Sequence, residues 1–310
     1  MKNTFGQSLT VTLFGESHGA AVGAVVDGLA PGLPVSREEI ERQLARRRPS
    51  DALSTARKEE DAFELLSGVF DGHTTGTPLC IVIPNRDTRS GDYSYGLARP
   101  SHADYAAYRK YHGYEDYRGG GHFSGRITAA LAAVGGILLP ALHRRGIEIG
   151  THILRCGGVA DRAFSDLAPE LSLLRTRVFP TLDPLRGEEM AERIRAAAQE
   201  NDSVGGIAQT AVLGLPAGLG EPWFDSVEGL LSHALFSLGG VKGVEFGAGF
   251  SMADLRASVC NDALSMQDGR VVTKTNRNGG INGGITNGMP VVFQCAVKPT
   301  PSIAQAQQTV

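Results

Sequence analysis

The chain has 310 residues, 42% hydrophobic and 20% charged, which is enough to bury a sizeable core in one large or two average domains. Its formal net charge of -3 argues against a general nucleic-acid binder, whose domain is usually basic. The scattered cysteines Cys80, Cys156, Cys260 and Cys295 show no paired spacing, so they fit neither a zinc or other metal site nor a disulfide framework. A reducing cytoplasm is the expected setting.

The first predicted strand covers residues 9–14 and runs directly into Gly15-Glu16-Ser17-His18-Gly19. The glycines allow a sharp turn or a close approach to a ligand. The histidine can change charge near neutral pH, which suits proton transfer or pairing with an anion. A single loop histidine is more often structural than catalytic, so this run alone leaves both interpretations open.

A helix is predicted to begin at Ser36 and to end at Pro49. Ser36 and Glu39 form a capping-box pattern, and Pro49 cannot continue a helix. Three arginines, Arg46, Arg47 and Arg48, therefore stand at its carboxyl end. They fit either a solvated cap against the helix dipole or an anion-binding cluster.

An apolar strand is predicted over residues 79–83, followed by a long, polar, irregular segment that reaches Gly121. Long ordered loops are usually functional. The turn Gly119-Gly120-Gly121 leads into a helix near Ser124, and free amides at such a helix start favour an anion. Residues 127–142 are apolar but fall short of the ~20 residues of a membrane helix, so a buried core helix is expected.

The second half predicts an amphipathic helix over 182–201 and strands over 207–213, 243–250 and 291–297. Helices and strands alternate irregularly, without an internal repeat or an obvious linker. This order favours a single mixed domain with antiparallel pairing over a doubly wound fold.

Short motifs along the chain resemble, in their order, those of the chorismate synthase family. The matching segments are Thr4-Phe5-Gly6, Phe14 to Gly19, Arg46 to Pro49, Arg57 to Asp61, Leu66 to Phe70, Thr74 to Pro78, Arg89 to Tyr93, Arg99 to Asp104, Arg118 to Gly121 with Ser124 and Arg126, Asp202 to Gly206, Asn261-Asp262, Gly279 to Gly284 and Lys298 to Pro301. Each motif is weak by itself, but the ordered set is highly specific.

The resemblance implies an α+β fold over residues 1–310, a single-domain β-α-β sandwich in which two antiparallel four-stranded sheets pack with helices. It implies a homotetramer, while the net charge, the short apolar stretch and the cysteines lead us to expect a cytoplasmic protein that binds neither nucleic acid nor membrane. The implied activity is a lyase reaction of the shikimate pathway: 5-enolpyruvylshikimate 3-phosphate loses phosphate in a 1,4-elimination and becomes chorismate. Reduced FMN is required without net redox change, and NADPH is a candidate reductant.

The resemblance also assigns residues. His18 and His102 are the expected catalytic histidines, His18 for the departing phosphate and His102 for the protonation of the reduced flavin. The expected substrate residues are Ser17, Arg47, Arg48 and Arg126, with Arg99 as a further candidate. Guanidinium groups suit a substrate with two carboxylates and a phosphate because they bind such groups in a bidentate way.

The expected flavin contacts lie in three parts of the sequence. They are His122, Phe123 and Ser124; Gly239, Gly240 and Gly283; and Lys298, Pro299, Thr300, Pro301 and Ser302. For the glycines, a purely structural role in turning the chain remains open.

The chain departs from the family pattern at several positions. His122 and Phe123 replace an arginine and a serine, Ile127 replaces a glutamate, and Leu53 stands where an arginine is expected. Family members continue beyond residue 310 through an Arg-x-Asp motif, so we expect the active site to lack a closing segment. One alternative is a non-catalytic flavin- or phosphate-binding homologue that lost this segment. A second, argued without the family, is a phosphotransferase that uses its glycine loops for a nucleotide, which the absence of a P-loop motif disfavours.

Overall fold

The computed structural model describes residues 2–48, 59–88, 91 and 93–310. The chain divides into two compact units, one of residues 1–141 and 301–310 and the other of residues 142–300. The single domain expected over 1–310 stays a prediction. Leu53 lies outside the described residues.

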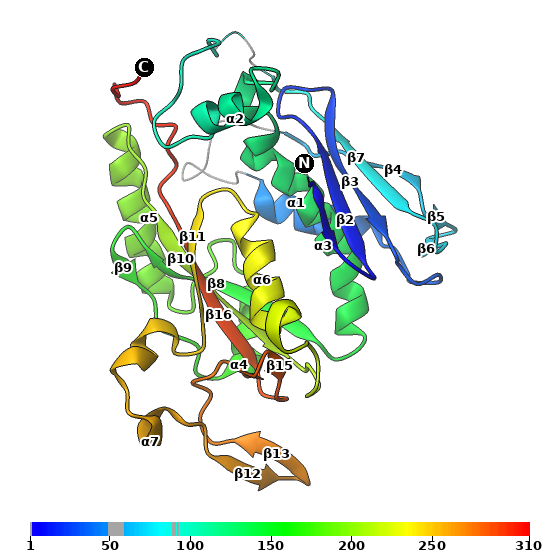
Figure 1. Cartoon of the computed structure of the whole chain (residues 1–310), viewed down its shortest axis with the longest axis vertical. Coiled ribbons are helices and arrows are strands. Elements are labelled where there is room, and N and C mark those ends of the chain that lie inside the picture. The colour runs from blue at the N-terminus through cyan, green and yellow to red at the C-terminus, as the bar shows by residue number, and fades with distance from the viewer. Residues whose placement is uncertain (1, 49–58, 89–90, 92) are drawn as a thin grey trace. The chain divides into compact units, whose positions relative to one another are not determined.

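The first unit contains a five-stranded antiparallel sheet in the order β1-β2-β3-β7-β4 (Figure 1). Its strands are β1 (Thr4–Gly6), β2 (Thr10–Gly15), β3 (Ala21–Asp27), β4 (Glu64–Ser67) and β7 (Leu79–Pro84), with the small hairpin β5 (Val69–Phe70) and β6 (His73–Thr74). Its helices are α1 (Arg37–Arg47), α2 (Asp104–Tyr111) and α3 (Thr128–His143), with 3-10 turns η2 (Arg118–Phe123) and η3 (Gly125–Ile127).

The core of this unit lies between the sheet and helices α1 and α3. Alternate residues of β3 and β7, such as Val22 and Ile81, are fully buried against Ile40 of α1 and Ala133 of α3. The two helices approach closely, because a Cβ atom on Gly136 would lie 2.6 Å from the Cα of Ile40. The alternation in the strands and the spacing in the helices therefore generate one apolar layer.

Helix α3 and the turn before it form an apolar stretch, Gly125–His143, that is long and apolar enough to cross a membrane by length and composition. Its residues Ala129, Ala130 and Ala133 are fully buried in the core of the unit. The predicted core helix is thereby confirmed. Pro140 lies inside it, near its carboxyl end.

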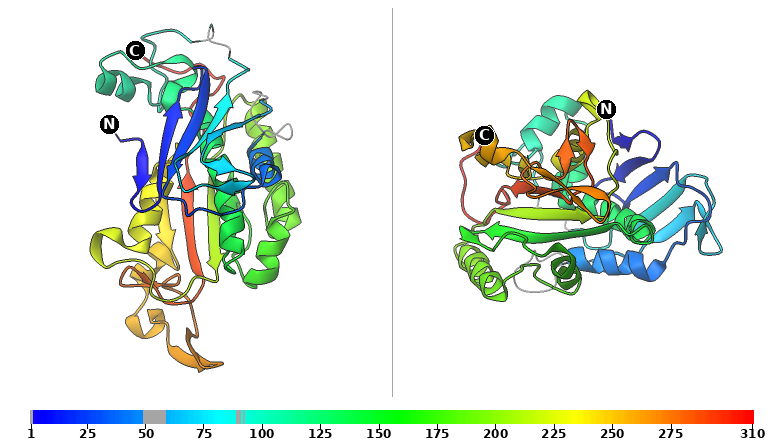
Figure 2. Two further views of the ribbon diagram at one scale, coloured as in Figure 1. Left: turned by 90° about the vertical axis from the view of Figure 1, so that its right-hand side faces the viewer. Right: turned by 90° about the horizontal axis from the view of Figure 1, so that it is seen from below.

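The second unit contains a five-stranded antiparallel sheet in the order β11-β16-β10-β8-β9. These strands are β8 (Glu148–Cys156), β9 (Val159–Ala160), β10 (Gly206–Leu213), β11 (Val241–Phe246) and β16 (Val291–Val297). Helices α4 (Leu167–Leu174) and α5 (Pro184–Gln199) lie on one face, as Figure 2 shows, and α6 (Val227–Phe236) packs on an apolar cluster that includes Val291 and Phe293. The smaller elements are η4 (Trp223–Asp225), η5 (Gly249–Asp254), α7 (Ala257–Cys260), the hairpin β12 (Leu264–Gln267) and β13 (Arg270–Thr273), and the hairpin β14 (Ile281–Asn282) and β15 (Ile285–Thr286).

Three expectations from the sequence need correction. Each large sheet has five strands among the described residues, not four, because short edge strands such as the two-residue β9 extend them. The polar segment before Gly121 contains helix α2. The strand expected over 243–250 ends at Phe246, since Gly247 and Gly249 adopt positive φ of 56° and 54°.

Candidate active site

The loop after β2 carries Ser17 and His18 at one end of the first sheet. The pairing of Ala21 with Pro84 brings the end of β7 beside this loop. The Ser17 amide donates to the carbonyl of Gly121 at 3.0 Å, and Nδ1 of His122 lies 2.7 Å from the carbonyl of Gly15. The loop is therefore tied to the glycine turn of η2.

That turn contacts both histidines expected to be catalytic. Gly119, Gly120 and Gly121 all adopt positive φ, at 59°, 81° and 53°. A Cβ atom on Gly119 would lie 2.4 Å from the ring of His18, and one on Gly120 would lie 3.0 Å from the ring of His102. Glycine is needed for the backbone conformation and for the space, so the turn can lie directly against both imidazoles.

His102 belongs to a polar cluster with Arg99, Asp104 and Ser302. Nδ1 of His102 lies 2.6 Å from the Asp104 carboxylate, to which Arg99 donates from Nε and Nη2, each at 2.8 Å. Arg99 also donates to the hydroxyl of Ser302 at 3.4 Å. Burial raises the pKa of Asp104, but the hydrogen bonds from Arg99 and the charge of His102 outweigh it and lower this pKa to about 2. Nη2 of Arg99 also lies 3.0 Å from Nδ1 of His102, and the ring edge with Cε1 and Nε2 faces Gly120.

His18 has an acidic neighbour as well. The hydrogen bond from the Arg118 side chain lowers the pKa of Asp116, burial opposes this change, and the charge of His18 adds to the lowering. The ring of Tyr93 meets that of His18 edge-on at a centroid distance of 5.3 Å. Charge and ring contacts thus favour a fixed position for His18 next to the glycine turn.

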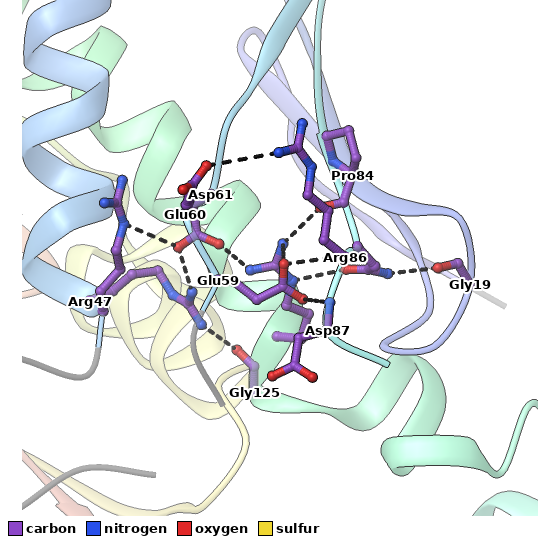
Figure 3. Close-up of polar contacts among 12 residues, drawn as sticks. Gly19, Arg47, Glu59, Glu60, Asp61, Pro84, Arg86, Asp87 and Gly125 are labelled. Atoms are coloured by element: carbon purple, nitrogen blue, oxygen red, sulfur yellow. Dashed lines mark hydrogen bonds and ion pairs between the residues drawn. The ribbon is translucent and has the colours of Figure 1, made fainter. Parts of the chain in front are cut away.

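The three predicted substrate arginines converge on the fully buried carboxylate of Asp61. Arg47 donates to it at 3.0 Å, Nε of Arg48 lies 3.9 Å away, and Arg126 donates to its other oxygen (Figure 3). A second buried acid, Glu59, lies 3.9 Å from Arg126 and accepts from the backbone amides of Arg86 and Asp87, each at 3.2 Å. Three guanidinium groups therefore face two carboxylates, and beside them Arg86 pairs with Glu60 at 3.8 Å.

These arginines differ in exposure. The side chain of Arg126 is 3% exposed, and its nitrogens donate to Asn85, Asp61 and the carbonyl of Pro84. The side chains of Arg47 and Arg48 are 25% and 35% exposed. Within this cluster, the exposed guanidinium surface belongs mainly to Arg47 and Arg48.

The residues predicted to contact flavin lie in both units. In the first, the Ser124 hydroxyl accepts from the amide of Arg126 at 3.3 Å, and Phe123 is 43% exposed beside Tyr111. In the second, the amide of Lys298 donates to the carbonyl of Gly240 at 2.9 Å. The remaining residues follow β16, flank β11 or form the β14–β15 turn: Gly239, Gly283, Pro299 and Thr300 in the second unit, and Pro301 in the first.

Sequence reasoning did not assign Asp61, Glu59 or Asn85 to the site. Glu59 and Asp61 stand in a motif quoted for the family resemblance, but their partners are far away in sequence. One signal could have found the two acids: buried arginines need carboxylate partners, so the predicted arginine cluster required acidic residues beside it.

The comparisons with known proteins agree with one another. A family profile described as chorismate synthase matches residues 9–310. A chorismate synthase of Thermococcus kodakarensis is 47% identical over 307 residues, which cover 98% of this chain and 85% of the relative. One of Methanosarcina mazei is 46% identical over 311 residues, with coverage of 99% and 85%.

The fold comparison points the same way. A solved structure described as the crystal structure of chorismate synthase superposes with a TM-score of 0.79 at 31% identity, covering 96% of this chain and 85% of that one. A profile match over nearly the whole chain, close relatives and a shared mixed α/β fold with antiparallel sheets lead to one conclusion. The chain belongs to the chorismate synthase family.

Proposed function

We propose that this protein is a chorismate synthase, a carbon–oxygen lyase acting on a phosphate. It converts 5-enolpyruvylshikimate 3-phosphate to chorismate by 1,4-elimination of phosphate. The observation that supports this proposal best is the glycine turn at residues 119–121, which touches the rings of His18 and His102 at once. One turn thereby keeps two imidazoles close together, as an elimination that needs two controlled protons requires.

The cations of the site suit this substrate. The proposed substrate residues are Ser17, Arg47, Arg48 and Arg126. The exposed ends of Arg47 and Arg48 can bind a carboxylate or phosphate in a bidentate way. Arg126 keeps the buried carboxylates in place. His18, held against Gly119, donates a proton or a positive charge to the departing phosphate oxygen.

The residues near His102 fit a reduced flavin. Gly120 leaves space at the ring edge of His102 that a Cβ would fill, and the hydroxyl of Ser302 lies in the same cluster. Reduced FMN, when bound, supplies the redox chemistry of a reaction that has no net redox change. His102 holds a proton at the flavin ring, with Asp104 keeping the imidazole oriented. The further proposed contacts are His122, Phe123, Ser124, Gly239, Gly240, Gly283, Lys298, Pro299, Thr300 and Pro301.

The family resemblance supports four further proposals, on the arrangement of the sheets, the assembly, the compartment and the reductant. The two sheets belong to a β-α-β sandwich, the protein is a homotetramer, it works in the cytoplasm, and NADPH is its candidate reductant. Sedimentation tests the assembly, and reduction of FMN by NADPH in the presence of the protein tests the reductant.

The decisive experiment is phosphate release from 5-enolpyruvylshikimate 3-phosphate under anaerobic conditions with dithionite-reduced FMN. We expect turnover in wild type and a loss of roughly a hundredfold or more in His18→Ala, the scale of losing one general acid. We also expect reduced FMN to bind more tightly when the substrate is present. Flavin binding without phosphate release would instead indicate a non-catalytic homologue.

A further inference from the structure

We propose that Asn85 is a positioning residue for His18, acting through the backbone of the loop that carries it. The inference rests on the proposed function of His18 at the departing phosphate. Asn85 follows β7, whereas His18 follows β2, and the two segments meet at the same end of the first sheet.

The side chain of Asn85 spans the histidine loop. Its Nδ2 donates to the carbonyl of Glu16 and to that of Gly19, each at 2.9 Å (Gly19 is labelled in Figure 3). Its backbone amide donates to the carbonyl of Ala20 at 3.0 Å. Ser17 and His18 lie between the two carbonyls that share Nδ2, so one amide group fixes both ends of the catalytic turn.

Arg126 determines which way this amide points. Its Nε lies 2.9 Å from Oδ1 of Asn85, and a guanidinium group can only donate. The oxygen of Asn85 must therefore face Arg126, which leaves the NH2 group for the two loop carbonyls. The buried Asp61 holds Arg126 in turn. The ion cluster around Asp61 is thus connected to the backbone at His18 through a single amide.

An aspartate at position 85 would break this connection without changing the size of the side chain. It could still accept from Arg126, but it would bring a carboxylate oxygen against the carbonyls of Glu16 and Gly19. Both donated hydrogen bonds would become repulsive contacts. Because His18 lies close against Gly119, a shift of the loop would move its ring away from the glycine turn. A misplacement of about 1 Å can cost roughly a hundredfold in rate.

The test compares Asn85→Asp with wild type in kinetics and in histidine NMR. We expect kcat to fall by roughly 10- to 100-fold, the scale of a displaced catalytic group. KM should change by less than about threefold, because uniform binding by the arginines is retained. The histidines are labelled with 13C at Cε1, and the His18 signal is assigned with His18→Gln. We expect the His18 signal to shift or broaden, and that of the fully buried His152 in the second unit to stay constant.

Asn276→Asp is the matched control. Nδ2 of Asn276 also donates to a backbone carbonyl, that of Pro290 at 2.8 Å, but within the second unit. Its substitution should lower stability in urea while leaving the His18 signal unchanged. If Asn85→Asp lowered stability by a similar amount and left both kcat and the His18 signal as in wild type, Asn85 would be structural only and the inference would be wrong. Absence of turnover in wild type would contradict the proposed function, whereas the NMR comparison would still decide whether Asn85 positions His18.

Discussion

Two imidazole–aspartate pairs, one in each unit, show how the same pair of residues can serve different purposes. In the second unit, Nδ1 of His152 lies 3.1 Å from Asp161, and both side chains are fully buried. In the first, Nδ1 of His102 lies 2.6 Å from Asp104, with 16% and 17% of the side chains exposed. The remaining contacts of each pair distinguish them.

The pair in the second unit is enclosed by the fold. Nε2 of His152 lies 3.0 Å from Oε1 of Gln209, and Asp161 accepts from the amides of Arg162, Leu182 and Asp183. The pair in the first unit has a charged partner instead, the guanidinium of Arg99, and its imidazole edge faces Gly120. Both ring nitrogens of His152 contact side chains within the second unit, which suits a role in the fold, whereas the ring edge of His102 lies beside Gly120, which suits contact with a ligand.

Asp161→Ala should have the largest effect and should test the structural half of this comparison. The substitution leaves three backbone amides, that of Leu182 buried, without their acceptor and breaks a fully buried pair, which typically costs about 3–5 kcal/mol. Urea unfolding measures the loss, and Asp166→Ala, at an exposed acid nearby, is the control. A change below about 1 kcal/mol, the scale of a surface contact, would show that His152–Asp161 does not support the fold as described.

His102→Ala should come next, with an effect on chemistry instead of stability. We expect turnover to fall by roughly a hundredfold, equivalent to about 2.7 kcal/mol, with an altered absorption spectrum of bound reduced FMN. The control is His73→Ala, at an exposed histidine of the β5–β6 hairpin. An unchanged spectrum together with full activity would remove His102 from the flavin side of the proposed mechanism.

Asp104→Asn should give the smallest effect, one that depends on pH. The folded pKa of Asp104, about 2, lies below the ordinary value of 3.8, so ionised Asp104 stabilises the folded state above pH 3.8. That contribution is lost as the pH falls toward 2. We expect wild type to exceed Asp104→Asn by about 1 kcal/mol near pH 6, after allowance for solvent screening, and the difference to shrink below pH 3.8. A difference that is constant between pH 6 and pH 3 would contradict the role given to the charge.

The sequence predicted regular elements where a local pattern exists. Alternating or continuous apolar runs located β2, β7, β10 and β16, and the Ser36 hydroxyl accepts from the Glu39 amide at 3.1 Å, as the capping box predicts. Helix α2 was missed because it has only eight residues, all polar or aromatic except two alanines, and no side-chain cap at Ala103. Edge strands of two residues are too short for any periodicity to be visible.

The site was predictable only in part, for a related reason. Glycine-flanked motifs and the family resemblance pointed to His18, His102 and the arginines. Asp61 and Asn85 were missed because their partners lie far along the chain: Asp61 pairs with Arg126 65 residues later, and Asn85 bonds to Glu16 69 residues earlier. Pairings at such separations are set by sheet register, which no local window of sequence contains.

The first unit is built from two separated stretches of chain, with the whole second unit between them, and this order has a consequence for biosynthesis. His18, Asn85 and Gly121 are synthesised early. Ser302, the partner of Arg99, lies 203 residues after Arg99 in the chain. At a translation rate of about 5–20 residues per second, roughly 10–40 s pass between the synthesis of Arg99 and that of Ser302. The corner of the site around His102 is therefore completed only after the sequence of the second unit has been synthesised.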